Sequence, residues 1–116
     1  MYQQNTTTHT ATSAAIKYLK AYNGKDAILA ARALACIGDC YVNLEDYKTA
    51  LNYFEKAVAA GDNLIAAEYL LDAGLVAEKL GQNEKALGFY KQIKENYAAA
   101  PQAYDIDKYI SRIEAK

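Results

Sequence analysis

The sequence is poor in the residue types that most enzymes use. It contains one His, His9, and two Cys, Cys36 and Cys40, and it has no Gly-rich phosphate loop. Nucleophilic catalysis needs a Ser or Cys beside a His, and a structural zinc needs about four ligands. Because His9 lies in a Thr-rich stretch remote from both cysteines, we predict no catalytic residues, no metal site, no cofactor and no enzymatic activity.

Other absences exclude further classes. The 13 basic and 14 acidic residues are spread along the chain, so no basic patch points to nucleic acid. No uncharged apolar run approaches the roughly 18 residues of a membrane-spanning helix, which predicts no direct membrane insertion by this chain. The first residues also lack the basic and apolar regions of a secretory signal. We therefore expect residues 1–12 to be a disordered or artificially added tail.

The residues that are abundant favour helices. Ala is frequent and there are 11 Tyr, against only 6 Gly and 1 Pro among 116 residues. This composition is typical of an all-α protein, and the length suits one domain. Pro101 fits the first turn of a last helix, which we expect over residues 101–115.

The chain repeats itself. An offset of 36 residues pairs Gly38 with Gly74, Leu34 with Leu70, Leu44 with Leu80, Ala50 with Ala86, Leu51 with Leu87, Tyr53 with Phe89 and Phe54 with Tyr90. An offset of 35 residues aligns residues 15–22 with residues 50–57. A period in this range with helical patterning indicates stacked helix pairs. Within each pair, we expect the second helices over residues 47–60 and 83–97, Gly81 in a left-handed turn, and Asp46 or Asn83 as helix caps.

These residues resemble the tetratricopeptide repeat. The motif is Leu34-x-x-Ile37-Gly38-x-x-Tyr41 followed by Ala50-x-x-x-Phe54-x-x-Ala57, with Leu34 for the usual Trp and Asp62 for the usual Pro. The second unit carries Leu70, Ala73, Gly74, Ala77, Ala86, Tyr90 and Ile93 in the same slots. The resemblance implies an all-α right-handed superhelix of antiparallel helix pairs with a C-terminal capping helix. Its units are a half repeat 13–24, repeats 25–61 and 62–98, and a cap 101–115 within a domain 13–116.

The resemblance also implies a function. The first helices of such pairs line a concave groove that binds a peptide or helix of a partner protein. The groove positions are Arg32, Ala35, Asp39, Val42, Asn43, Glu68, Leu71, Leu75, Glu78 and Lys79. Leu71 and Leu75 either anchor the partner or are covered by a neighbouring helix. Ala35 and Asp39 replace the residues by which some members clamp a carboxylate, so we do not expect chaperone-tail recognition.

Two further interpretations concern the cysteines and the N-terminal half repeat. Cys36 and Cys40 occupy packing positions, and we expect free thiols rather than a disulfide. Ala15, Leu19 and Tyr22 form an apolar edge that an absent first helix would cover. Either the edge is a homodimer surface or the chain is a fragment of a longer array, so the alternative function is a homo-oligomerising structural fragment of a longer, possibly membrane-anchored repeat protein. The chain then resembles the C-terminal part of bacterial repeat proteins similar to the ancillary translocon subunit. That resemblance implies the extracytoplasmic side of a membrane if a preceding segment is an anchor, and otherwise the cytoplasm.

Overall fold

The computed structural model describes residues 12–22, 24, 26–61 and 65–116, and every regular element in these ranges is helical. The tail expected over residues 1–12 lies outside them except for Thr12, and so does Asp62 of the motif. A helix over residues 12–20 comes first. It is followed by α2 (Ala27–Asn43), α3 (Tyr47–Ala60), α4 (Ile65–Lys79), α5 (Asn83–Asn96), the 3-10 helix η1 (Pro101–Ala103) and α6 (Ile106–Glu114).

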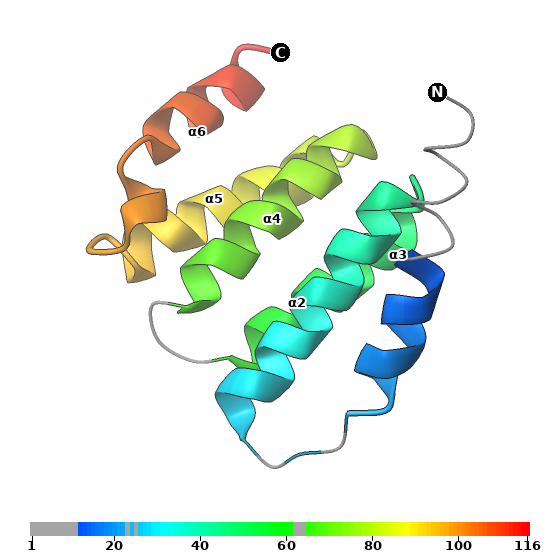
Figure 1. Ribbon diagram of the computed structural model, residues 1–116. Coiled ribbons are helices and arrows are strands. Elements are labelled where there is room, and N and C mark those ends of the chain that lie inside the picture. Colours follow the sequence, from blue (N-terminus) through cyan, green and yellow to red (C-terminus); the bar gives the residue numbers. More distant parts are fainter. Residues whose placement is uncertain (1–11, 23, 25, 62–64) are drawn as a thin grey trace.

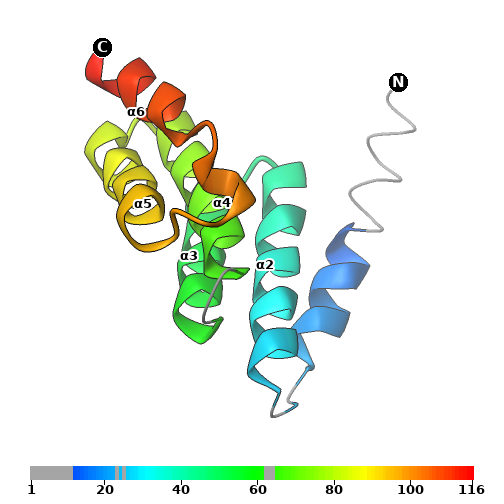
Figure 2. The ribbon, with the colours of Figure 1, turned by 90° about the vertical axis from the view of Figure 1, so that its left-hand side faces the viewer.

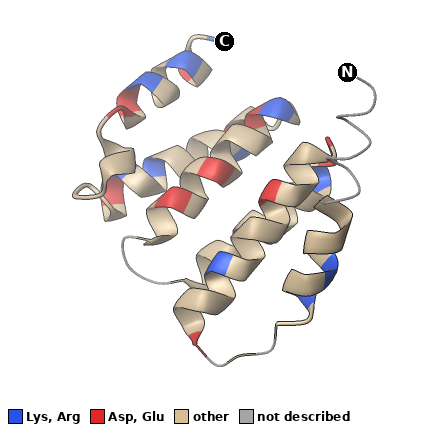
Figure 3. Ribbon diagram, in the orientation of Figure 1, with Lys and Arg blue, Asp and Glu red and all other residues tan. Residues whose placement is uncertain are grey.

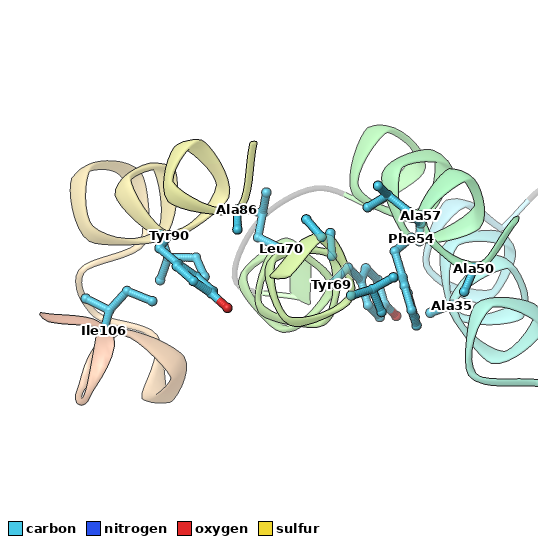
Figure 4. Close-up of a cluster of buried hydrophobic side chains, with 14 of the residues drawn as sticks. Ala35, Ala50, Phe54, Ala57, Tyr69, Leu70, Ala86, Tyr90 and Ile106 are labelled. Carbon is cyan, nitrogen blue, oxygen red and sulfur yellow. The ribbon is translucent and has the colours of Figure 1, made fainter. Parts of the chain in front are cut away.

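The helices stack in sequence order. The main packing contacts join α2 to α3, α3 to α4, α4 to α5 and α5 to α6, as Figures 1 and 2 show. The described part of the chain measures 38 × 37 × 20 Å. Since a helix with its side chains is about 10 to 12 Å across, the short dimension is two helices thick. In the end-on view of Figure 4, α2 and α4 form one layer, and α3 and α5 form the other.

The turns follow local chemistry. Asp26 and Asp46 cap α2 and α3, because their carboxylates accept hydrogen bonds from backbone N–H groups of the first turn. Gly81 has φ +76°, as predicted for a left-handed residue after α4. The expectation for Asn83 was wrong: it is the first residue of α5, and the capping position is Gln82, whose side chain makes no capping bond.

The two glycines of the repeat allow close packing of large rings. A Cβ added to Gly38 would lie 2.8 Å from Cε1 of Phe54, and one added to Gly74 would overlap the ring of Tyr90. Both rings are buried. Figure 4 shows the ring of Phe54 between α2 and α4, and the ring of Tyr90 on the opposite side of α4. The repeat offset therefore corresponds to a repeated contact in which a ring of the second helix fits against a glycine of the first.

The C-terminal cap differs from the single helix expected over residues 101–115. Pro101 begins η1, and α6 starts only at Ile106. Ile106, Ile110 and Ile113 are buried at spacings of three and four, which places one face of α6 against the core. The cap lies beside α4 and α5, at the end of the stack (Figure 1).

An ion pair holds α6 to α4. Nη2 of Arg112 lies 2.5 Å from Oε2 of Glu78, whose side chain is 12% exposed. The guanidinium also lies 4.9 Å from the ring centroid of Tyr109, which packs on the ring of Tyr90. Glu78 therefore belongs to the contact between the repeat and its cap.

Candidate functional site

A groove runs between α2 and α4. It holds a cavity of about 210 Å³ that is lined by Asp39 and Val42 of α2, Phe54 of α3, and Asp72, Leu75, Val76 and Lys79 of α4. Phe54 comes from the other layer and is 1% exposed, so its ring forms the floor. The walls are mainly apolar, and the carboxylates of Asp39 and Asp72 come from the two facing helices. We call this cavity and its lining the α2–α4 groove.

Four of the residues predicted to line a groove meet in the α2–α4 groove: Asp39, Val42, Leu75 and Lys79. The other six lie elsewhere. Ala35 is 6% exposed and belongs to the core, and Leu71 packs partly buried against that core. Glu78 pairs with Arg112. Arg32, Asn43 and Glu68 are exposed and do not line the cavity. A binding role for the predicted residues stays a prediction.

Three lining residues were not among the predicted groove residues: Phe54, Asp72 and Val76. Asp72, Leu75, Val76 and Lys79 recur at spacings of three and four, which is the signal of one helix face. Leu71 and Glu78 lie on the adjacent face, about 100° away around the helix axis. The repeat pattern predicted α4, but it did not show which of these two faces lines the groove.

Of the two groove carboxylates, Asp72 is partly buried and Asp39 is exposed. Burial, together with the negative charges of Asp39 and Glu68, raises the pKa of Asp72 to about 7. Burial and the charge of Glu68 also raise the pKa of Asp39. Near neutral pH, Asp72 is therefore divided between its protonated and ionised forms.

The raised pKa of Asp72 predicts a pH-dependent stability. The folded value of about 7 lies above the ordinary 3.8, so the folded state holds the extra proton between these values. This contribution is fully present below pH 3.8 and is lost as the pH rises through about 7. At pH 8 we expect Asp72→Asn to exceed the wild type by ~2 kcal/mol, less than the full linkage free energy because water screens the carboxylate. At pH 4 the two should be nearly equal.

Urea denaturation at several pH values measures this difference. Glu84→Gln is the matched control, because Glu84 is an exposed carboxylate on α5. The control should follow the wild-type curve. If the stability of Asp72→Asn fell with rising pH as steeply as that of the wild type, Asp72 would not be the titrating group.

The two cysteines are free and partly buried, as predicted. Burial is the main cause that raises the pKa of each thiol, and the charge of Asp39 adds to it. A raised pKa keeps the thiol protonated at neutral pH and lowers its reactivity. Within the described ranges, no group of three or more His, Cys, Asp or Glu side chains is arranged to hold a metal ion.

The predicted N-terminal edge faces the stack in part. Leu19 and Tyr22 line a second cavity, of about 310 Å³, together with residues of α2 and α3. Nζ of Lys20 donates to the hydroxyl of Tyr41 at 3.2 Å and lies over the stacked rings of Tyr41 and Tyr53. The helix over residues 12–20 is thereby packed against α2, and self-association through Ala15, Leu19 and Tyr22 stays a prediction.

The geometry defines a class of protein: antiparallel helix pairs, repeated with a glycine–ring contact, that stack into an α-solenoid and end in a capping helix. A model of the tetratricopeptide repeat family matches residues 30–99, and the chain belongs to this family. Searches of curated proteins and of solved structures found no match to this chain. Tetratricopeptide repeats generally mediate protein–protein interactions and are typically non-catalytic scaffolds. Among the helices that the structure describes, none has the length and apolar character needed to cross a bilayer.

Proposed function

We propose that this protein is a non-catalytic interaction module that binds a peptide or helix of a partner protein in the α2–α4 groove. The observation that carries the proposal is the cavity of about 210 Å³ between the two first helices of the repeats. Leu75 is partly exposed on its wall and is absent from the hydrophobic core cluster. An apolar side chain in this position gains from contact with a partner, because that contact removes it from water.

Leu75→Gln tests the proposal. The substitution removes an apolar surface of the groove without changing its charge, and the core is left intact because Leu75 lies outside it. We expect a ligand held in the groove to bind the variant at least tenfold more weakly, which corresponds to about 1.4 kcal/mol. Affinity capture from a cell extract, with the wild type and the variant side by side, measures the loss.

Tyr104→Gln is the control for this capture. Like Leu75, Tyr104 carries an apolar surface, its ring, and it is 90% exposed. It follows η1 directly and does not line the groove. Its replacement should leave capture unchanged. Partners that both variants retain equally well would place binding outside the groove and contradict the proposal.

A further inference from the structure

Acidic side chains converge on the α2–α4 groove from both of its walls. Asp39 stands on α2 and Asp72 on α4, and both line the cavity. Glu68, one turn before Asp72, lies close enough for its charge to act on both carboxylates. Figure 3 shows acidic segments on the two neighbouring helices α2 and α4. The polar part of an otherwise apolar groove is therefore predominantly anionic.

Lys79, the cation that lines the groove, has another contact, and Arg32 does not line the cavity. Nζ of Lys79 lies 5.3 Å from the ring centroid of Tyr47 on α3, in a cation–π contact. The charge of Arg32 acts on Cys36 and Tyr69. Among the residues that the structure describes, ion pairs form at Glu55, Glu78, Asp105 and Asp107, and none forms at Asp39 or Asp72. Asp72 is partly buried without a positive partner, and a bound cation would offset the cost of that burial.

We infer that the occupant of the α2–α4 groove is a cationic segment of a partner protein, which inserts an apolar side chain beside Val42 and Leu75 and a Lys or Arg between Asp39 and Asp72. The inference rests on the proposed function, since it specifies the chemistry of the ligand at the same site. A cavity of about 210 Å³ that is open to solvent leaves room for a side chain of the partner. Charge complementarity at such a groove selects the partner and its orientation.

Binding of a cation should also depend on pH. A Lys or Arg beside Asp72 favours the ionised carboxylate, so binding releases a proton wherever Asp72 is protonated in the free protein. The ionisable groups around Asp72 are Asp39 on α2 and Glu68, Tyr69 and Lys79 on α4. Burial raises the pKa of the Tyr69 hydroxyl, which stays neutral. We expect a cationic peptide to bind about tenfold more weakly at pH 5.5 than at pH 8. In Asp72→Asn this difference should largely disappear.

A displayed library of random 12-residue peptides, panned at pH 8 on the whole chain and on Leu75→Gln, tests the inference. Peptides retained by the wild type and lost by the variant are groove-dependent. We expect them to combine an apolar residue with at least one Lys or Arg and to carry a net positive charge. A synthetic copy of such a peptide should bind Asp39→Asn, Asp72→Asn at least tenfold more weakly than the wild type, and should bind Glu84→Gln unchanged. Circular dichroism verifies that each variant is folded.

The outcomes separate the two proposals. The inference would be wrong if the groove-dependent peptides were neutral or acidic, or if they bound the Asp39→Asn, Asp72→Asn variant as tightly as the wild type. Either result would leave the proposed function standing. An absence of groove-dependent peptides would overturn both. If the wild type instead formed a dimer that Leu75→Gln dissociates, measured by light scattering, a second copy of the chain would be the occupant and the inference would be wrong.

Discussion

Replacing Phe54 by Ala should lower the free energy of unfolding by ~4 kcal/mol, because buried Phe to Ala changes typically cost about 3 to 5 kcal/mol. Phe54 is 1% exposed, and its ring fills the space between α2, α3 and α4. The loss combines the removal of apolar contacts with a cavity that the rigid helix backbones cannot close. Chemical denaturation with an unchanged m-value measures it.

Tyr104→Ala is the comparison for Phe54→Ala. Its side chain is 90% exposed, so truncation of a ring at this site should change stability by no more than about 0.5 kcal/mol. A loss below about 1 kcal/mol for Phe54→Ala would mean that the ring is not in the core and that the repeat register is incorrect.

Gly74→Val is expected to cost ~3 kcal/mol, at the upper end of the usual range for overpacking. A Cβ at Gly74 overlaps the buried ring of Tyr90, and the additional methyl groups of Val increase that overlap. Either the ring or α5 has to move, and the neighbouring contacts of Tyr109 on Tyr90 move with it. Thermal and urea unfolding of the variant measure the cost.

Gly88→Val is the matched control, because Gly88 is also a helix residue but has no atom within 4 Å of an added Cβ. It should remain within about 0.5 kcal/mol of the wild type, since Val and Gly differ little in helix propensity. A double-mutant cycle adds a specific test: in a Tyr90→Ala background, Gly74→Val should lose most of its cost. If its cost were the same in both backgrounds, the steric contact with the ring would not explain it.

The helices that carry the repeat were predictable because their boundaries depend on neighbours in the chain. The predicted ranges 47–60 and 83–97 agree closely with Tyr47–Ala60 and Asn83–Asn96. Asp46 was identified as a cap because an Asp can accept a hydrogen bond from the next turn wherever it precedes a helix. The C-terminal region was predicted less well, since Pro101 is compatible with the start of either an α-helix or the observed η1.

The groove was only partly predictable. Asp39, Val42, Leu75 and Lys79 were among the expected groove residues, and Asp72 was not. A helical face is defined by spacing, but its orientation in the protein depends on the crossing of α2 and α4 and on the cap. Glu78 illustrates this dependence: its position on α4 fits a groove, yet Arg112 of α6 engages it. No periodic pattern relates these two residues.

The sequence by itself determined the repeat, the helix pairs and the Gly38 and Gly74 positions at which rings approach the backbone, because these features follow from periodicity and side-chain size. The tertiary structure decided which side of α4 faces the groove and which groups share it. It brought Asp72 near Asp39 and partly buried it, and together with the charge of Glu68 this raises the pKa of Asp72 to about 7. Burial and the charge of Asp39 on α2 are the larger causes of this shift, and both exist only after the helices have packed.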